Sequence, residues 1–443
     1  MNWDIIQAEA IQHLQQLIRI DTTNPPGNEL AAAEYLAGVL RAEGYDPIVS
    51  EAAPQRGNCI TRLCGDGSLP PLLLYTHLDV VPAEPEHWTH PPFSGDVVDG
   101  YVWGRGALDM KSIAAMQLMT MLLLKRSGAT LHRDVIFAAT ADEEIDSDVG
   151  AEWLVKQHPD LVRAEYGLSE MGGHTLHLEG KRFYPVQTAE KGTCWFKVRA
   201  TGRPGHGSVP HADNAVVHLA RAIDRVASRP LPLHLTPTAA HYVQSLAHAI
   251  GGTSGLLLSA ALNPLLHDAA LKAIPDRNFA DALHAILHNT VSPNQLRAGY
   301  KVNVIPSEAE AVLDGRMLPG FDAESFLAEV RSRLGDDLEI SIVHTSPPLE
   351  SPIDTPLFRL IEQQIARSDP GAIAVPYMLT GATDAKLFAQ LGTHCYGFAP
   401  MLIEPDDAFE GLVHGHDERI TLKALAFGVK ALFETVQEFC AAR

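Results

Sequence analysis

The chain has 443 residues, and its formal net charge is −20. This length is more than one ordinary hydrophobic core holds, so it predicts two domains. The negative charge argues against nucleic acid as a partner, since phosphate binding needs basic patches. The apolar stretches are interrupted and too short to span a bilayer, so we expect no membrane partner.

The five cysteines are scattered along the chain and form no pair of CxxC motifs. That usage indicates a reduced, cytoplasmic protein and argues against a zinc site built from thiolates. The first 20 residues contain acidic side chains and lack the basic start of a signal peptide. They instead predict an amphipathic helix whose apolar face comprises Ile5, Ile6, Ile11, Leu14, Leu17 and Ile18.

From about residue 30 to residue 190, strands alternate with helices. The pattern predicts a helix in 31–45, a strand in 71–77, a helix in 112–128 and a strand in 134–140. Such alternation implies an α/β fold in which helices flank a mostly parallel sheet.

The character of the sequence changes near residue 190. Strand-like segments at 191–202, 301–318 and 338–346 alternate with helical ones at 214–227 and 322–335, which predicts a small α+β domain inserted in the first. The turn-rich stretch 346–354 indicates its exit linker. We therefore expect a first domain of residues 1–188 and 348–443, and an inserted domain of residues 189–347.

One strand of the predicted sheet ends in two polar side chains. His77 and Asp79 follow the apolar run 72–76 and, being two residues apart, point to the same face. Ligands of open α/β sheets bind beyond the carboxyl ends of the strands. An imidazole there is a good zinc ligand, and a nearby carboxylate can orient its ring. For this stretch alone, a capped strand with a hydrogen-bonded histidine is the alternative.

Carboxylates also follow other predicted elements. Asp142, Glu143 and Glu144 come after the apolar strand at 134–140, where a solvated acidic loop is the alternative. Asp109 precedes the long apolar helix, where an aspartate is also a favoured N-cap.

Two more segments complete the set: Glu170 stands before two glycines, and His414 and His416 open the last helix. Two Zn²⁺ ions with a bridging carboxylate need such oxygen and imidazole ligands. Such a pair would polarise a carbonyl and activate a water, while a further carboxylate takes the proton. The doubled Glu143–Glu144 supplies one ligand and one base.

Eight motifs now stand in order along nearly the whole chain: "THLDVVP", "GRGALDMK", "ADEE", "SEMGG", "GRPGHGSVP", "NVIPSEAEAVLDGR", "TGATDAK" and "HGHDE". In this the chain resembles the zinc exopeptidases and deacylases, the family of aminoacylase, acetylornithine deacetylase, succinyl-diaminopimelate desuccinylase and bacterial glutamate carboxypeptidase. The resemblance implies a catalytic domain that holds two Zn²⁺ ions, which Co²⁺ or Mn²⁺ can replace, and an inserted lid and dimerisation domain.

The resemblance also implies a role for each residue of the metal centre. His77 and Glu170 would bind one zinc, His414 and Glu144 the other, and Asp109 would bridge both. His414 is preferred to His416 because the family's ligand lies four residues before the glutamate of that motif. The remaining roles go to Glu143 as general base and acid, and to Asp79 as the residue that orients His77.

In the inserted domain, His206 resembles the lid histidine that reaches the partner subunit's site and stabilises the oxyanion, which implies a homodimer. Asn303 and Arg316 match lid residues that hold substrate, and Arg316 suits a carboxylate. A substrate-facing loop would contain Gly381, Thr383 and Asp384. Family members also place a cis peptide after the bridging aspartate, so we expect one between Asp109 and Met110.

The lid carries extra sequence between about residues 230 and 298, including the apolar "AHAIGGTSGLLLSAALNPLL". In this it is similar to the larger carboxypeptidase S and acyl-amino-acid hydrolase branch. The segment predicts either extra lid core or dimer surface, or a wall for an apolar acyl group or side chain.

The function expected from this set is hydrolysis of an amide bond next to a free α-carboxylate. The small-molecule substrate would be a dipeptide, a peptide C-terminus or an N-acyl amino acid. Two alternatives stay open: a biosynthetic deacylase of one metabolite, such as acetylornithine or succinyl-diaminopimelate, and a non-catalytic metal-dependent binding protein.

Overall fold

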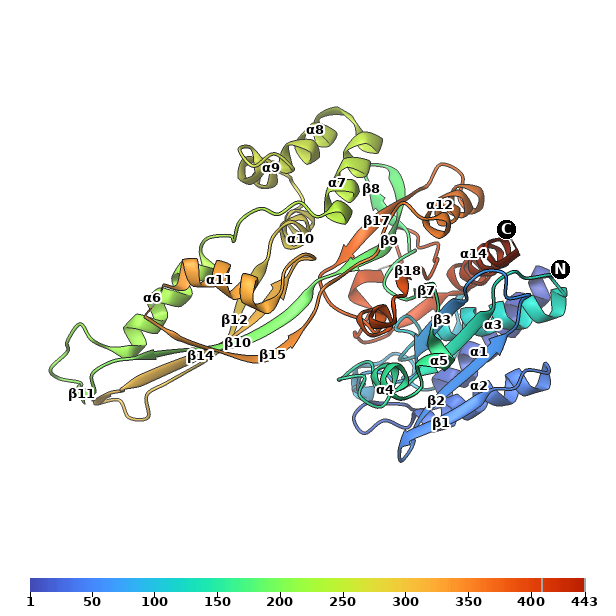
Figure 1. Cartoon of the computed structure of the whole chain (residues 1–443), viewed down its shortest axis with the longest axis horizontal. Coiled ribbons are helices and arrows are strands. Elements are labelled where there is room, and N and C mark those ends of the chain that lie inside the picture. The colour runs from blue at the N-terminus through green and yellow to red at the C-terminus, as the bar shows by residue number, and fades with distance from the viewer. Residues whose placement is uncertain (336, 408, 442–443) are drawn as a thin grey trace. The chain divides into compact units, whose positions relative to one another are not determined.

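The computed structural model describes residues 1–335, 337–407 and 409–441, and its ribbon is drawn in Figure 1. The chain divides into two compact units. The large unit comprises Met1–Thr188, Ser351–Tyr377 and Thr383–Arg443, and the inserted unit comprises Ala189–Glu350 and Met378–Ala382. The short segment Met378–Ala382, which the sequence assigns to the first domain, thus groups with the insertion. There the carbonyl of Leu379 accepts a hydrogen bond from the backbone of Lys191.

The described part of the large unit contains α-helices, short 3₁₀ helices and two β-sheets. Its α-helices are α1 (Trp3–Arg19), α2 (Glu29–Ala42), α3 (Lys111–Ser127), α4 (Ala151–Gln157), α5 (Pro159–Val162), α12 (Pro356–Ser368), α13 (Ala385–Phe388) and α14 (Leu422–Ala441). Its 3₁₀ turns are η1 (Pro85–His87), η2 (Ala389–Leu391) and η3 (Phe409–Gly411). Its strands are β1 (Ile48–Ala53), β2 (Arg56–Leu63), β3 (Leu72–His77), β4 (Val97–Val98), β5 (Tyr101–Trp103), β6 (Val135–Thr140), β7 (Tyr166–Ser169), β8 (Leu176–Leu178), β9 (Lys181–Glu190, which ends in the inserted unit), β17 (Ile373–Leu379, likewise), β18 (His394–Gly397) and β19 (Arg419–Thr421).

The main sheet runs in the order β1-β2-β6-β3-β7-β18-β9. Its centre is parallel, because β3 pairs in parallel with β6 and β7, and β7 with β18. Strands β1 and β2 extend one edge in antiparallel pairing. Parallel central strands are buried on both faces and read as continuous apolar runs, as "LLLYT" and "VIFAA" do. The predicted α/β class, with helices flanking a mostly parallel sheet, is confirmed.

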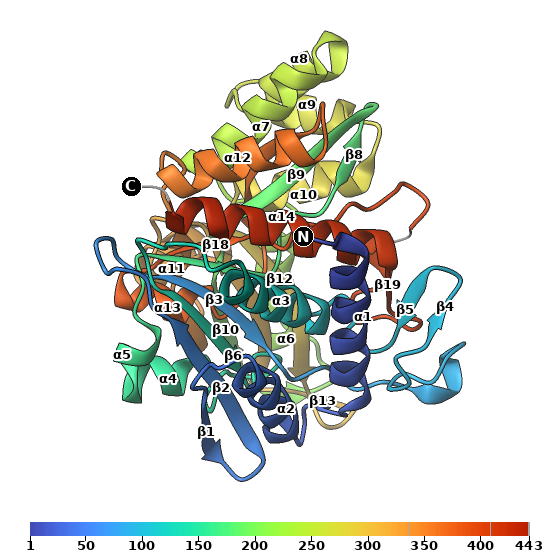
Figure 2. The same ribbon diagram turned by 90° about the vertical axis from the view of Figure 1, so that its right-hand side faces the viewer.

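The side chains of β3 show how the two faces are covered. Leu72 and Leu74 belong to the apolar core that α1, α2, α3, α12 and α14 share, and Figure 2 shows α1, α2, α3 and α14 on one side of the strands. Tyr75 points the other way, and its ring contacts Phe388 of α13, with centroids 4.7 Å apart. Since alternate residues share a face, His77 ends the strand on the Tyr75 side.

The N-terminal helix is confirmed as α1, but one residue of its predicted apolar face is wrong. Ile6, Leu14, Leu17 and Ile18 are buried, whereas Ile5 is 65% exposed. Successive residues of an α-helix are 100° apart, so Ile5 lies outside the buried stripe that Ile6 heads.

The inserted unit is built on a second, antiparallel sheet in the order β12-β14-β10-β15. Its strands are β10 (Gly192–Thr201), β11 (Gly205–His206), β12 (Thr290–Ala298), β13 (Val304–Ile305), β14 (Glu308–Met317), β15 (Glu339–Ser346) and β16 (Leu349–Glu350). Its helices are α6 (Ala215–Ala227), α7 (Pro237–Ile250), α8 (Gly252–Ala261), α9 (His267–Ala273), α10 (Arg277–Leu287) and α11 (Ala323–Leu334).

Helices α6 and α11 cover one face of this sheet through an apolar core of their own. Phe196 of β10 meets Phe326 of α11 edge to face, with ring centroids 6.2 Å apart. The extra lid sequence forms α7 to α10. Lys191 ties this segment to the sheet, since its ammonium donates to the carbonyls of Ala285 and His288 and to the Thr290 hydroxyl. Among the described residues, no helix combines the length and hydropathy that crossing a membrane requires.

Candidate metal centre

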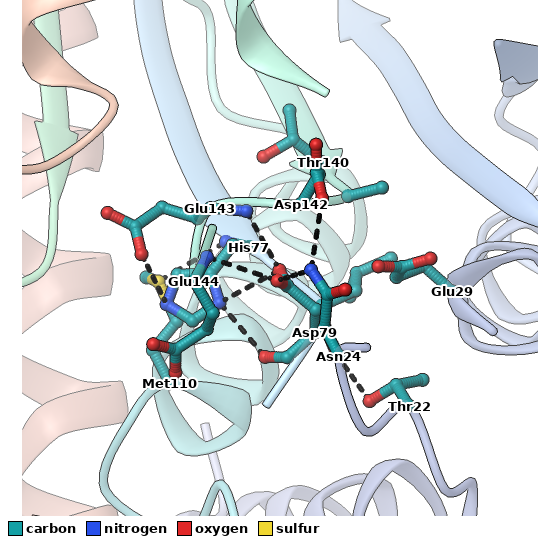
Figure 3. A network of polar contacts seen from close by, with 12 residues as sticks. Thr22, Asn24, Glu29, His77, Asp79, Met110, Thr140, Asp142, Glu143 and Glu144 are labelled. Carbon is teal, nitrogen blue, oxygen red and sulfur yellow. Dashed lines mark hydrogen bonds and ion pairs between the residues drawn. The ribbon is translucent and has the colours of Figure 1, made fainter. Parts of the chain in front are cut away.

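Imidazole and carboxylate side chains gather at the carboxyl ends of β3, β6 and β7. His77 is the last residue of β3, Glu143 and Glu144 lie in the loop after β6, and Glu170 directly follows β7. Because β3 pairs in parallel with both neighbours, these ends meet at one edge of the sheet. Figure 3 shows His77, Glu143 and Glu144 together there.

Asp109 lies between two histidines. Its Oδ1 is 3.1 Å from Nε2 of His77, and its Oδ2 is 3.2 Å from Nε2 of His414. Glu144 adds an oxygen 3.3 Å from the His414 nitrogen. On the other side, oxygens of Glu170 and Glu143 lie 3.8 and 3.9 Å from the His77 nitrogen. Asp109 therefore offers one oxygen to each half of the cluster.

The hydrogen bonds of His77 assign its ring tautomer. Its Nδ1 lies 3.0 Å from the backbone oxygen of Asp79, which can only accept, so Nδ1 carries the hydrogen. Nε2 then faces the oxygens of Asp109, Glu143 and Glu170. Burial opposes a charge on this ring, but hydrogen bonds to Asp109, Asp79 and Glu170 raise the pKa of His77 well above its ordinary value. This half of the cluster therefore favours positive charge at Nε2, whether a proton or a metal ion supplies it.

The rest of the donor set fits metal ions as well. His77, Asp109 and Glu144 form one group whose ligand atoms lie within 4.8 Å of one another, and His77, Glu143 and Glu170 form a second. Oε1 of Glu144 is buried, and within the described residues it accepts no hydrogen bond. Oxygen and imidazole ligands without thiolates suit Zn²⁺, Co²⁺ or Mn²⁺.

Burial and the crowding of charged groups in this cluster shift the pKa values of its side chains. Burial raises the pKa of Glu143 well above its ordinary value, and the Glu170 charge adds to the effect. Burial also raises the pKa of Glu170, to about 8. The neighbouring carboxylates of Asp109 and Glu144 raise the pKa of His414 to about 10. Several carboxylates thus compete for ionisation in a dry site, and added positive charge would relieve that competition.

Asp79 connects the end of β3 to the loop after β6. It is fully buried, and its two oxygens accept the backbone N–H groups of Glu143 and Glu144, each at 3.1 Å. Burial opposes ionisation, but hydrogen bonds from His77, Asn24 and Glu144 hold its pKa below its ordinary value. The sequence-predicted partner of His77 therefore also fixes the backbone of the doubled glutamate.

Glu418 is a buried anchor of the centre to which sequence reasoning assigns no role. One carboxylate oxygen accepts from the backbone of Leu108 and Asp109, at 2.7 and 3.1 Å, and the other from Arg105 and the backbone of Gly106. It thereby holds the turn that presents Asp109. The available signal is its place in "HGHDE", an acidic residue just before an apolar helix.

The two histidines of that motif have different surroundings. His414 has φ +59°, and its ring reaches Asp109 and Glu144. His416 pairs instead with Glu84 at 3.0 Å on the surface. The structure therefore brings the preferred histidine, and not its neighbour, into the cluster. The peptide bond between Asp109 and Met110 is cis, as predicted.

The three lid residues belong to the inserted unit. His206 on β11 is exposed, and its Nδ1 accepts the backbone N–H of Ser208 at 3.2 Å, which leaves Nε2–H as a donor. Asn303 is exposed as well. Arg316 on β14 is half-buried, and its Nε and Nη2 donate to Asp314 of the same strand at 2.7 and 3.1 Å.

The predicted substrate loop divides between the two units. Gly381 belongs to the inserted unit, and Thr383 and Asp384 belong to the large unit. Asp384 is buried, and its oxygens accept from Ser147 at 2.6 Å and from Thr140 at 3.2 Å. Burial raises the pKa of this carboxyl to about 6. Asp384 therefore braces the segment that follows β6.

A cluster of imidazole and carboxylate side chains at the carboxyl edge of a parallel sheet suits a metal-dependent hydrolase, and comparison with known proteins identifies the family. The model of "Peptidase family M20/M25/M40" matches residues 73–438. The chain belongs to this family.

Three curated relatives show the range of activities among similar proteins. The human N-fatty-acyl-amino acid synthase/hydrolase PM20D1 is 28% identical, over 98% of this chain and 88% of that protein. The "Probable carboxypeptidase S-like 2" of Dictyostelium discoideum is 30% identical, over 81% and 69% of the two chains. Human aminoacylase-1 is 27% identical, over 92% and 89%.

Solved structures share the fold at lower identity. The M20 family metallo-carboxypeptidase Sso-CP2 of Sulfolobus solfataricus aligns with a TM-score of 0.69 and 17% identity, over 97% of this chain and 98% of that one. Human carnosine dipeptidase 1 aligns with a TM-score of 0.66 and 16% identity, over 99% and 98%.

Proposed function

We propose that the protein is a di-zinc hydrolase that cleaves the amide bond of N-acyl amino acids, next to their free α-carboxylate. The observation that carries the two-metal part is the position of Asp109, which turns one oxygen to His77 and the other to His414. Glu170 on one side and Glu144 on the other supply a further carboxylate to each histidine. Such a shared carboxylate is the ligand that a pair of divalent ions needs between them.

Glu143 is the proposed general base and acid. When bound, the two ions would polarise the amide carbonyl and lower the pKa of the attacking water. The Glu143 carboxylate takes the proton of that water and returns it to the nitrogen of the leaving amine. The carboxylate of Asp79 accepts the backbone N–H of Glu143 and so keeps Glu143 in place. The same Asp79 carboxylate lies close to the ring of His77. Both side chains that move or position the proton, Glu143 and Asp79, belong to the large unit.

The substrate class rests on the relatives and on the lid. Human PM20D1 is an N-fatty-acyl-amino acid synthase/hydrolase and the second human relative is an aminoacylase, and these alignments cover 98% and 92% of the chain. From Pro230 to His267 the lid sequence has no Asp, Glu, Lys or Arg. An uncharged lid segment suits an apolar acyl group better than a charged peptide. Arg316 is proposed to bind the α-carboxylate, and the 381–384 loop to face the substrate.

We further propose a cytoplasmic homodimer in which His206 acts in the partner's site. The exposed edge strands of the lid sheet support a dimer, since β12 carries Leu296 at 60% exposure and β15 carries Val343 at 58%. The Nε2–H of His206 is the hydrogen-bond donor that an oxyanion needs. The five unpaired cysteines support a reducing compartment.

The experiment that tests the proposal is a hydrolysis screen of the purified, zinc-loaded protein. The panel contains N-acyl amino acids with acyl chains from acetyl to palmitoyl, dipeptides with the same C-terminal residue, and each substrate with its carboxylate amidated. We expect the acyl amino acids to give the highest kcat/KM, and the amidated forms to be poor substrates. Preference for dipeptides would turn the assignment to a peptidase, and equal cleavage of amidated substrates would contradict carboxylate recognition.

A further inference from the structure

The segment Thr22–Asn24, between α1 and α2, lies along the chain just past β3. The backbone N–H of Asn24 donates to the Val80 carbonyl at 2.9 Å, the N–H of Val80 donates to the Thr22 carbonyl at 3.2 Å, and the Thr22 hydroxyl donates to the Leu78 carbonyl at 2.7 Å. The segment therefore follows residues 78–80 closely and brings the Asn24 side chain beside Asp79 (Figure 3).

The amide of Asn24 joins two carboxylates. Its Nδ2 donates to Oδ2 of Asp79 at 2.9 Å and to Oδ1 of Asp142 at 3.0 Å. Its own Oδ1 is buried and, within the described residues, has no hydrogen-bond partner. The reverse orientation of the amide would turn that oxygen toward both carboxylates. The side chain is thus used for its donors alone, at the cost of one unsatisfied oxygen.

Asp142 is itself fixed by a buried ion pair. Arg56 donates to Asp142 at 2.7 Å and, through Nε and Nη2, to both oxygens of the fully buried Glu29 at 2.7 and 2.8 Å. Gly27 covers this guanidinium with φ +78°, and a Cβ there would come within 2.4 Å of it. The guanidinium of Arg56 is therefore held between Glu29 and Asp142.

These contacts end at the proposed catalytic residue. Asp142 directly precedes Glu143, and Asp79, at the other end of the Asn24 amide, accepts the backbone N–H of Glu143. Asn24 thus closes a ring of contacts around that one peptide unit. The pairs lie far apart in sequence, 55 residues for Asn24 and Asp79 and 118 for Asn24 and Asp142.

We propose that Asn24 is a positioning residue for the hydrolysis, because its amide couples Asp79 to the Asp142 carboxylate that Arg56 holds. The inference rests on the proposed role of Glu143 as general base. Asn24 acts through Asp79 on the direction of the Glu143 side chain, and its amide donates to Asp79 and Asp142, neither of which is a proposed metal ligand.

Asn24→Ala and Asn24→Asp test this role, because a donor role and a space-filling role predict opposite orders. Aspartate has the shape of asparagine but adds a third carboxylate facing Asp79 and Asp142, whereas alanine only removes the donors. Coupling through the amide predicts a kcat about 10-fold lower for the alanine variant, as for other outer residues of a metal site, and a larger loss for the aspartate variant. KM should stay within about 2-fold of wild type, since Asn24 does not contact substrate.

Asn58 provides a matched control in the same unit. This buried side chain also braces the loop after β6: its Oδ1 accepts the backbone N–H of Ala141 at 3.0 Å, and its Nδ2 donates to the Val149 carbonyl at 2.9 Å. Asn58→Asp keeps the acceptor and turns its second oxygen to a neutral carbonyl, whereas Asn24→Asp turns an oxygen to two carboxylates. The kcat of the aspartate variant relative to that of the alanine variant should therefore be higher at position 58 than at position 24.

Each variant is also checked for metal content per chain and for its thermal midpoint, and kcat is measured well below that midpoint. If Asn24→Asp is as active as Asn24→Ala or more so, or if KM changes as much as kcat, the positioning role is wrong. Glu143→Ala is measured beside them. An active Glu143→Ala overturns the proposed function, whereas an inactive one together with fully active Asn24 variants overturns only the role of Asn24.

Discussion

The two units place their predicted functional residues in opposite environments. In the large unit, Asp79, Asp109 and Glu170 are buried, and each has an oxygen close to the His77 ring, at 3.4, 3.1 and 3.8 Å. In the inserted unit, His206 and Asn303 are exposed. Because the carboxylates of a metal centre repel one another, the fold must hold them together before a metal ion binds. Residues that hold substrate need only be presented at the surface that the substrate reaches.

Buried charge differs between the units in the same way. The large unit buries carboxylates in a connected set that runs from Glu29 to Asp142 and from Asp79 to the centre. The inserted unit buries Glu190 and Lys191, and the ammonium of Lys191 donates to backbone carbonyls and one hydroxyl and so ties elements together, as that of the buried Lys111 does to the Ile20 carbonyl in the large unit. Anionic burial concentrated on one edge of a sheet marks a cation site, whereas a single cation satisfied by backbone oxygens marks a structural tie.

The largest effect should come from removing metal ions. Dialysis of the protein against a chelator should abolish amide hydrolysis, and Zn²⁺, Co²⁺ or Mn²⁺ should restore it, because the cluster contains oxygen and imidazole ligands that accept all three. Activity is followed together with elemental analysis, and a sample dialysed against buffer alone serves as the control. Full turnover in a metal-free sample would contradict the contrast drawn between the two units.

The next effect separates the two neighbouring glutamates. Glu143→Ala should keep its metal ions and lose roughly 10²–10⁴ in kcat, since that is the usual contribution of a general base. Glu144→Ala should instead lose a metal ion, because Oε1 of Glu144 faces His414 at 3.3 Å. Metal content and kcat are measured for both variants. The reverse pattern would exchange the two roles.

Sequence alone predicts the large unit better than the insertion, for a physical reason. The runs that become β3 and β6 are uninterrupted and apolar because both faces of a central parallel strand are buried. The edge strand β12 contains Pro293 and mostly exposed side chains, so it has no apolar alternation to detect. Of the region that forms α7 to α10, the sequence indicates only the apolar stretch 247–266, which lies in α7, α8 and the turn that follows, because similar side chains serve core and surface there.

The residues of the candidate metal centre also divide into those that sequence predicts and those that it does not. Its candidate ligands can be named from sequence because each stands in a short motif beside an apolar strand or helix, and the resemblance of these motifs to the family implies their roles. Asn24, Arg56 and Glu418 were missed because their roles depend on partners far along the chain. Glu418 and the backbone of Asp109 are 309 residues apart. No local spacing encodes such a contact, although "TTNPPGNE" already marks an irregular turn between two helices.

A smaller effect tests whether the two units of different chains work together. Glu143→Ala and His206→Ala should each be nearly inactive as homodimers, and a mixture allowed to exchange should regain activity. One site of a mixed dimer then has Glu143 from its own chain and His206 from the partner. Random exchange makes about half the dimers mixed, with one working site each, so recovery should reach roughly a quarter of wild type.

Each variant incubated alone is the control for this recovery. Sedimentation of the wild-type chain, whose mass is 48.0 kDa, measures whether the dimer forms. A monomer without complementation would defeat the trans role of His206. The metal chemistry of the large unit would remain, so the result would confine the active site to a single chain.

The smallest effect concerns acid stability in the large unit, away from the metal centre. Burial lowers the pKa of His174 from its ordinary 6.5 to about 4, and its ring packs against Phe409 with centroids 4.7 Å apart. The unfolded chain therefore takes up a proton at this histidine first as pH falls. Its contribution to folding is complete above about pH 6.5, is lost progressively as pH falls to about 4, and amounts to at most about 3 kcal/mol.

His174→Phe keeps an aromatic ring against Phe409 and removes the titrating group. Its free energy of unfolding in urea should therefore fall less than that of wild type between pH 7 and pH 4, with the two curves diverging below about pH 6.5. His174→Gln removes the ring as well, so it should lower stability at neutral pH yet show the same weak dependence on pH. Curves that stay parallel for all three proteins would mean that the pKa of His174 is the same in the folded and unfolded states, and would contradict this effect of burial.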